Sequence, residues 1–254
     1  MDIVDLLWQL HHNPAVSLSE AQQDLLADSG LSFDAGQTAQ LQLLERWAAQ
    51  GTPLGGWKIG MTSGANRNAM GDGVRPFGFV LAERIFASGS SLPLTDLHKG
   101  QVENELALLI GQPLGADADS ESAFAAVEAI LPAFEINQKR LPAGASSGLR
   151  VADDLSNYGI VVGAPVAAVR DLSQMQVTLL DSDDEVIESV ASHDHIDDHY
   201  ESLAILARRL HQFGQSLQPG QYVITGAYGK TPFAPGRYTG HFDCGVGDVE
   251  VILE

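Results

Sequence analysis

Two glutamates, Glu103 and Glu105, stand one residue apart at the head of an apolar run in the stretch KGQVENELALLIG (99–111). Side chains alternate between the faces of a strand, so this spacing predicts two neighbouring carboxylates on one face. The run ELALLIG is almost continuously apolar, which is typical of a strand covered on both faces. Buried like charges repel each other unless a proton or a cation compensates them. The stretch therefore indicates either two exposed acids at the start of a strand or a buried pair that binds a cation.

A third acid, Glu135, has a similar setting in the apolar segment ILPAFEIN (130–137), with no charged residue after it until Lys139. Moving an unpaired carboxylate out of water is costly, whereas one hard divalent cation compensates several carboxylates at once. Two acids on one strand face and a third from another strand would form an all-oxygen site suited to Mg²⁺ or Mn²⁺. The three glutamates are therefore candidate metal ligands.

Lys58 is the candidate for proton chemistry, because it lies among apolar residues and glycines in GGWKIGMTS (55–63). A lysine in such surroundings can lose its proton near neutral pH and act as a base or an electrostatic clamp. It can equally be a lysine at a strand edge whose amino group reaches back to water. Both readings stay open at the level of sequence.

The segment HDHIDDH (193–199) contains three histidines at spacings that could bind zinc. Its acids, which follow a predicted hairpin at LLDSDDEVIE (179–188), favour a polar loop or a loop over an active site instead. Cys244, between Asp243 and Gly245, is expected to be an inert thiol rather than a nucleophile. GAYGKT (226–231) fails as a phosphate loop because Ile224 occupies the position that requires glycine.

Composition limits the partners. The chain of 254 residues carries 33 acidic and 14 basic side chains, a formal net charge of -19. Such a surface repels phosphate backbones and anionic membranes, so neither nucleic acid nor a membrane is an expected partner. One cysteine excludes an intramolecular disulfide and fits a cytoplasmic location. No basic leader opens the chain, and no apolar run approaches the roughly 18 residues of a membrane span.

The elements that must position these residues change character near residue 54. Helical spacing predicts three helices within residues 1–53. Residues 54–254 contain short β-rich runs divided by Gly and Pro, with helices predicted over 120–132 and 200–214. Because strands and helices do not alternate regularly, the pattern predicts an α+β fold. We expect a helical N-terminal region followed by a β-rich catalytic core with a curled mixed sheet or a barrel.

The ordered motifs carry a resemblance to a known group. From about Gly56 to the C-terminus, roughly four-fifths of the chain is similar to the 2-oxopent-4-enoate hydratase and 4-oxalocrotonate decarboxylase group of the fumarylacetoacetate hydrolase superfamily. The stretches that carry the resemblance are GWKIGMTS, VRPFGFVL, QVENELALLIG, LPAFEINQKRL, VADDLSNYGIVVGAP, LARRL and VITGAYG.

The resemblance implies a divalent-metal-dependent lyase that hydrates a small 2-oxo-alkenoic acid, similar to 2-hydroxypentadienoate, through a metal-stabilised dienolate. It implies Mg²⁺ or Mn²⁺ as cofactor and a homo-oligomer or a complex with a sister enzyme. The alternatives are a decarboxylase of 4-oxalocrotonate-type 2-oxo acids, a C–C hydrolase of the superfamily, and a non-catalytic partner subunit. The group's positions fall on Glu103, Glu105 and Glu135 as metal ligands, Lys58 as catalytic residue and Ser156 as substrate contact.

Two departures leave the substrate and the water-activating group open. Hydratases of the group often carry an acid before the Phe-Gly of the second motif, where this chain has Pro76. They also commonly have a Gly-His-Pro-like turn before the late helix, where this chain has IDDHYES (196–202). His195 or His199 is a candidate replacement for the missing group.

Overall fold

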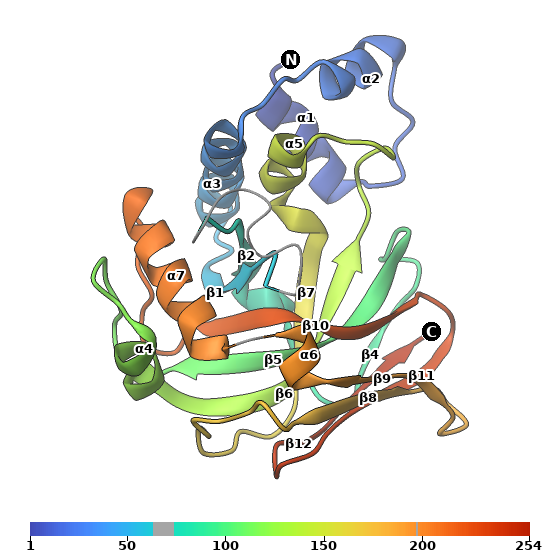
Figure 1. Ribbon diagram of the computed structural model, residues 1–254. Coiled ribbons are helices and arrows are strands. Elements are labelled where there is room, and N and C mark those ends of the chain that lie inside the picture. Colours follow the sequence, from blue (N-terminus) through green and yellow to red (C-terminus); the bar gives the residue numbers. More distant parts are fainter. Residues whose placement is uncertain (63–73, 197) are drawn as a thin grey trace.

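The N-terminal helices gather at one end of the molecule, and later helices lie beside the two mixed β-sheets (Figure 1). The computed structural model describes residues 1–62, 74–196 and 198–254, without the side chains of Asp194 and His195. The helices and strands are α1 (Ile3–His12), α2 (Glu20–Ala27), α3 (Phe33–Ala49), β1 (Leu54–Ile59), β2 (Phe77–Leu81), β3 (Ile85–Ala87), β4 (Ser90–Leu92), β5 (Gly100–Ile110), α4 (Ser120–Ala126), β6 (Val127–Gln138), α5 (Ser147–Ala152), β7 (Asn157–Val162), β8 (Gln176–Leu180), β9 (Val186–Ala191), α6 (Ser192–His195), α7 (His199–Gln212), β10 (Tyr222–Pro232), β11 (Gly236–Phe242) and β12 (Gly247–Leu253).

The strands form two sheets that pack face to face. The larger sheet has the order β2-β1-β10-β5-β6-β7-β3, and the smaller has β4-β12-β11-β8-β9. A Cβ at Gly240 of β11 would lie 2.3 Å from the Asn104 side chain on β5 and 3.2 Å from Phe134 on β6, so the sheets approach closely there. The described strands do not close into a barrel. The predicted α+β fold is confirmed, in its form with curled mixed sheets (Figure 1).

The N-terminal helices pack against the larger sheet and α5. Ser32 caps α3 by accepting a hydrogen bond from the Ala35 amide. The buried amides of Gln37 and Gln40 on this helix both donate to the Phe77 carbonyl of β2, and Gln40 also donates to Val151 of α5 at 2.8 Å. These bonds fix α3 against β2 and α5, and α5 lines the site. The division of the chain into residues 1–53 and 54–254 stays a prediction.

Two local predictions were wrong. The helix predicted over 120–132 ends at Ala126, and β6 begins at Val127. Val127 and Leu131 pair with β5 in a mostly buried strand, and this pairing outweighs the helical spacing of the sequence. The segment 193–199 is not simply a polar loop, since α6 ends within it and His199 opens α7 after its N-cap, Asp198.

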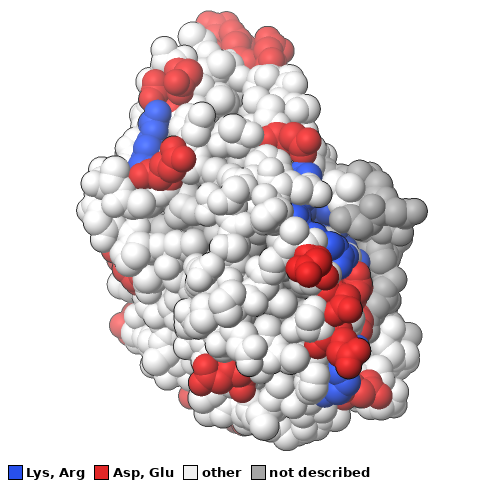
Figure 2. All heavy atoms as spheres, turned by 90° about the vertical axis from the view of Figure 1, so that its left-hand side faces the viewer, with Lys and Arg blue, Asp and Glu red and all other residues white. Residues whose placement is uncertain are grey.

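The surface reflects the acidic composition. On the face in Figure 2, acidic groups are spread from top to bottom, and the basic groups lie beside acidic ones. Within the described ranges, no helix has both the length and the apolar character to cross a membrane.

Candidate metal and substrate site

The three predicted metal ligands lie together on one face of the larger sheet. Glu103 of β5 is directly opposite Glu135 of β6, and Glu105 follows two residues along β5. One carboxylate oxygen of each lies within 4.8 Å of those of the other two. Glu105 and Glu135 are 3% and 1% exposed, so these two are not surface acids. Among the described residues, no other group of three acids, histidines or cysteines is placed to hold a metal ion.

Glu135 and Glu103 are both held by hydrogen bonds. The Lys58 Nζ of β1 donates to Glu135 Oε1 and forms a buried ion pair with it. The Asn157 amide at the start of β7 donates to the same oxygen at 3.0 Å. The Gln101 side chain donates to Glu103 Oε1. These contacts orient the carboxylates in the way that outer contacts orient metal ligands.

Glu105 is held by an irregular part of β10. The pairing register between β10 and β5 shifts between Ile224 and Ala227, and the amide of Gly226 in this bulge donates to Glu105 Oε2. Gly226 has φ of 126°, and a Cβ there would lie 1.9 Å from Thr62 Oγ1. Only glycine fits both the backbone conformation and the space.

The electrostatics fit a divalent cation. Burial, followed by the negative charge of Glu135, raises the pKa of Glu105 well above its ordinary value. Burial also raises the pKa of Glu135. Among the described residues, this hollow is lined by four carboxylates, the triad and Glu188, and by three cations, Lys58, Arg150 and Lys230, so its lining carries a net negative charge. Carboxylate oxygens are the ligands that Mg²⁺ and Mn²⁺ prefer, and this donor set matches them.

Lys58 behaves as a charged group. Its burial lowers its pKa, but the carboxylates of Glu135 and Glu103 oppose this, and the pKa lies above its ordinary value. The side chain is buried, and its Nζ lies 3.4 Å from the Leu155 carbonyl oxygen. The alternative of a lysine reaching back to water is therefore excluded. Of the two chemical roles considered for Lys58, a base and an electrostatic clamp, the clamp agrees with this geometry.

Ser156 sits in a strained turn beside Lys58. Asp154, Leu155 and Ser156 have consecutive φ values of 57°, 50° and 65°, in the left-handed region. Such residues cost on the order of 1–3 kcal/mol each and persist only where their surroundings fix them. Here the Phe79 amide donates to Asp154 Oδ1 at 2.7 Å. The turn holds Ser156 at the wall of a cavity that Lys58 also lines.

A buried cluster anchors this turn to α1. Arg140 donates to Asp153 Oδ1 at 2.9 Å and to the Asn157 carbonyl at 3.0 Å. His11 Nε2 lies 3.3 Å from the same Asp153 oxygen. Burial, aided by the charge of Arg140, lowers the pKa of His11 to about 4, so this histidine is neutral at pH 7. The N-terminal helix therefore helps to position the site.

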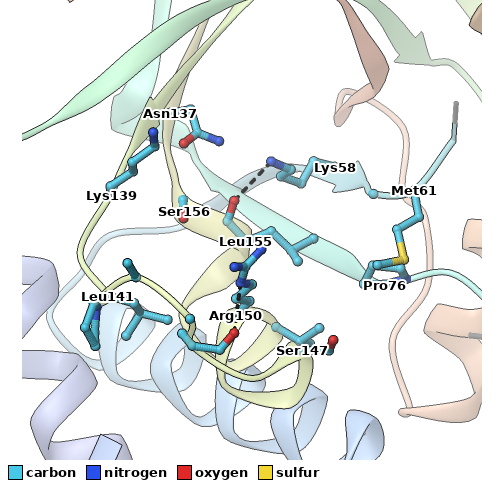
Figure 3. Close-up of a pocket in the computed structure, with 16 residues that line it drawn as sticks. Lys58, Met61, Pro76, Asn137, Lys139, Leu141, Ser147, Arg150, Leu155 and Ser156 are labelled. Atoms are coloured by element: carbon cyan, nitrogen blue, oxygen red, sulfur yellow. Dashed lines mark hydrogen bonds between the residues drawn. The ribbon is translucent and has the colours of Figure 1, made fainter. Parts of the chain in front are cut away.

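Two adjoining hollows open at the site and share part of their lining. The inner chamber, of about 490 Å³, is lined by the three glutamates and by Lys58. The outer cavity, of about 670 Å³, is lined by Lys58, Ser156 and Pro76. Figure 3 shows Lys58 on one side of the outer cavity and Asn137 and Lys139 on another, with Arg150 extending from α5 toward Leu155. The residues that line both hollows are Lys58, Gly60, Met61 and Arg150.

The histidine segment does not form a zinc site among the described residues. His199 is 3% exposed, with Nδ1 2.7 Å from Thr225 Oγ1 and Nε2 bonded to the Tyr228 hydroxyl. Burial lowers the pKa of His199 to about 4. This histidine lines neither hollow and is not positioned to replace the acid missing at Pro76. The side chain of His195, the other candidate, lies outside the described residues.

Sequence reasoning missed three residues of the site. Asn157 follows Ser156 in the motif VADDLSNYG, and its position beside a predicted substrate contact was an available signal. Gly226 belongs to GAYGKT, which was considered only as a phosphate loop. Arg150 carried no sequence signal, because its position depends on how α5 packs over the cavity.

Comparisons with known proteins agree with the motif resemblance. No family model matches the chain. The chain is 30% identical over 210 residues to a 2-keto-4-pentenoate hydratase of Paraburkholderia phymatum, covering 80% of this chain and 79% of that protein. It is 28% identical over 209 residues to a 4-oxalocrotonate decarboxylase of a Pseudomonas species, covering 82% and 81%.

Solved structures share the fold. A 4-oxalocrotonate decarboxylase of Pseudomonas putida, complexed with magnesium and adipate, superposes with a TM-score of 0.88 at 22% identity, covering 99% of this chain and 96% of that chain. A fumarylpyruvate hydrolase of Pseudomonas aeruginosa, in complex with Mn²⁺ and pyruvate, gives a TM-score of 0.58 at 20% identity, covering 78% and 88%. The predicted superfamily fold is confirmed.

Proposed function

Because the chain belongs to the 2-keto-4-pentenoate hydratase family, we propose that it is a divalent-metal-dependent lyase that hydrates a small 2-oxo-alkenoic acid. The observation that carries the proposal is the convergence of three carboxylates beside a buried lysine at the wall of a cavity.

Glu103, Glu105 and Glu135 are the proposed ligands of the cation. A bound Mg²⁺ or Mn²⁺ would supply Lewis-acid chemistry toward the carboxylate and keto oxygens of a 2-oxo acid. Two hydrogen bonds keep two of the ligands in place. The backbone amide of Gly226 donates to Glu105, and the side-chain amide of Asn157 donates to Glu135.

Lys58 is the proposed catalytic residue. Its ammonium group lies between Glu135 and the outer cavity, where it can stabilise negative charge that develops on the substrate or hold a proton at Nζ. The Leu155 carbonyl fixes the direction of the amino group. The Ser156 hydroxyl is the proposed substrate contact, held at the cavity wall by the strained turn.

The sister decarboxylation is the second candidate, because relatives with both names match the chain at similar identity. Pro76 lines the cavity, and it occupies the sequence position at which the hydratases that the motifs resemble often carry an acid. This difference also favours keeping decarboxylation as an alternative. A C–C hydrolase rests only on shared fold. A non-catalytic partner subunit is disfavoured by the retained Lys58 and glutamate triad.

The test is to give the purified protein 2-hydroxypenta-2,4-dienoate and 2-oxohex-3-enedioate with Mg²⁺ or Mn²⁺. Loss of conjugated ultraviolet absorbance without CO₂ release is the expected result and indicates hydration. Loss accompanied by CO₂ indicates decarboxylation. If neither compound reacts with either metal present, the lyase proposal is wrong.

Three finer expectations accompany the function. The resident ion is proposed to be Mg²⁺ or Mn²⁺, which an all-carboxylate set suits better than zinc. The acidic composition and the lone Cys244 support a cytoplasmic location. A homo-oligomer, or a complex with a sister enzyme, is proposed from the family resemblance alone. Sedimentation of the purified protein, with and without the sister enzyme, tests the assembly.

A further inference from the structure

A cavity of about 400 Å³ lies apart from the two hollows of the metal site. Among the described residues, none lines both this cavity and one of those hollows. On β6, Asn137 lines the outer cavity and the next residue, Gln138, lines this one. On β7, Asn157 donates to Glu135 and the next residue, Tyr158, lines this one. Because consecutive side chains of a strand point to opposite faces, the cavity lies behind the metal site, and we call it the rear pocket.

Arg84 brings a positive charge to the rear pocket. It ends the short turn η2 (Ala82–Arg84), and its guanidinium carbon lies 5.0 Å from the centre of the Trp47 ring and 4.6 Å from that of the Tyr158 ring. These cation–π contacts hold the group in place. Within the described part of the chain it forms no ion pair, and its one hydrogen bond, from Nη1 to the Tyr158 carbonyl, is long at 3.4 Å. Burial lowers the pKa of Arg84, as expected for a cation that has no carboxylate partner.

Two buried N–H groups on the lining have no hydrogen-bond partner among the described residues. They are the side-chain Nε2 of Gln138, which is 2% exposed, and the indole Nε1 of Trp47, which is 6% exposed. A buried donor without an acceptor destabilises the fold. A ligand that offers acceptor oxygens would remove this penalty. The rear pocket thus combines uncompensated positive charge with unused donors.

The lining indicates the charge and shape of the ligand. The N–H groups of a guanidinium match the two oxygens of a carboxylate, and one guanidinium balances one negative charge. Asp96, the one acid on the described lining, is exposed and opposes a second negative charge on the ligand. The rings of Trp47 and Tyr158 and the side chain of Leu97 offer apolar contacts. These features favour a small monocarboxylate with an apolar body over a phosphate dianion.

We propose that the rear pocket binds a small monocarboxylate with an apolar body, held by Arg84 and Gln138. The site is separate from the metal and from the hollows in which the substrate is proposed to bind. The inference goes beyond the proposed lyase function and does not depend on it.

Calorimetry with the Mn²⁺-loaded protein tests the proposal, with benzoate as the probe and benzamide as its uncharged analogue. The wild type should bind benzoate at least about tenfold more tightly than benzamide, because only the carboxylate forms a charged hydrogen bond. Arg84→Met should lose about tenfold or more of the benzoate affinity and less than about twofold of the benzamide affinity. Inorganic phosphate, added as the dianion, should bind more weakly than benzoate.

Gln138→Leu tests the second contact without endangering the fold. It removes a buried donor that has no partner among the described residues, so the variant should unfold at no lower denaturant concentration than the wild type. Its benzoate affinity should fall by about two- to tenfold.

Arg46→Met is the matched control, since Arg46 is a partly exposed arginine of α3 outside the lining. It should keep the wild-type affinity for benzoate. Repeating the titrations after removal of Mn²⁺ separates the rear pocket from the metal, which also attracts carboxylates, and the benzoate affinity should persist. No binding of benzoate, equal affinity for benzamide, tighter binding of phosphate, wild-type benzoate affinity in Arg84→Met or Gln138→Leu, or binding that requires Mn²⁺ would overturn the proposal. None of these results depends on turnover, so the lyase function can fail while the rear pocket stands.

Discussion

Glu103 on β5 lies directly opposite Glu135 on β6, on the face of the sheet that Glu105 also occupies. A shift of one residue in the pairing register would place Glu135 on the other face of the sheet, away from Glu103 and Glu105. The site thus depends on strand pairing as much as on the glutamates themselves. Lys58 completes it from β1, two strands away from β5 across β10.

Glu135→Gln should remove one metal ligand and the ion-pair partner of Lys58 while preserving shape. Mn²⁺ affinity measured by calorimetry should fall by about 100-fold, and metal-dependent turnover should fall with it. Glu128→Gln is the matched control, because Glu128 lies exposed on the same strand and should keep wild-type binding. Undiminished Mn²⁺ binding in Glu135→Gln would remove this residue from the ligand set.

Lys58→Met should reduce turnover without weakening metal binding. Loss of the ammonium group should reduce kcat by about 10²–10⁴-fold, the range expected for one proton-transferring or charge-stabilising group. Mn²⁺ binding should persist, since the three glutamates remain. Lys99→Met, an exposed lysine that lines neither hollow, should retain full activity. Near-normal kcat in Lys58→Met would make Lys58 a structural residue.

Gly226→Ala should damage both stability and metal binding. The added Cβ meets Thr62 and forces a φ of 126° on alanine, which displaces the amide that holds Glu105. Gly89→Ala is the comparison, because Gly89 has φ of 85° but open space around it. Gly89→Ala should lose about 1 kcal/mol of unfolding free energy, and Gly226→Ala more than that. Only Gly226→Ala should weaken Mn²⁺ binding, by about tenfold. Wild-type Mn²⁺ affinity in Gly226→Ala would contradict the role of the bulge.

His199 should make the fold sensitive to acid. Its folded pKa of about 4 lies below the ordinary value of 6.5, so the folded state binds fewer protons than the unfolded state between these values. The stabilisation from neutral His199 is complete above pH 6.5 and is lost at up to about 1.4 kcal/mol per pH unit as pH falls toward 4.

Chemical denaturation between pH 4 and 7 measures this effect. His199→Gln should show a shallower loss of unfolding free energy with falling pH than the wild type. Tyr228→Phe removes the hydroxyl bonded to His199 Nε2 but keeps the His199 imidazole buried. This variant should therefore keep the steep loss of unfolding free energy with falling pH. Identical slopes for the wild type and His199→Gln would show that this histidine does not control acid stability.

The sequence by itself determined the local part of the site. Strand alternation predicted that Glu103 and Glu105 share a face, because the period of two belongs to the backbone and not to its neighbours. Ordered motifs indicated the superfamily, Lys58 and Glu135. Where a local pattern competed with long-range pairing, as in residues 127–132, the sequence alone predicted the wrong element.

Only the tertiary structure decided which strands pair and how their side chains shift the pKa values of one another. Register between β5, β6 and β10 follows from burial summed over the whole sheet, and no short stretch encodes it. The protonation of Lys58 depends on Glu135, which is 77 residues away in the chain. Arg150 lies at the cavity wall only because α5 packs over the cavity. Electrostatic energies depend on distance and burial in space, and these exist only after folding.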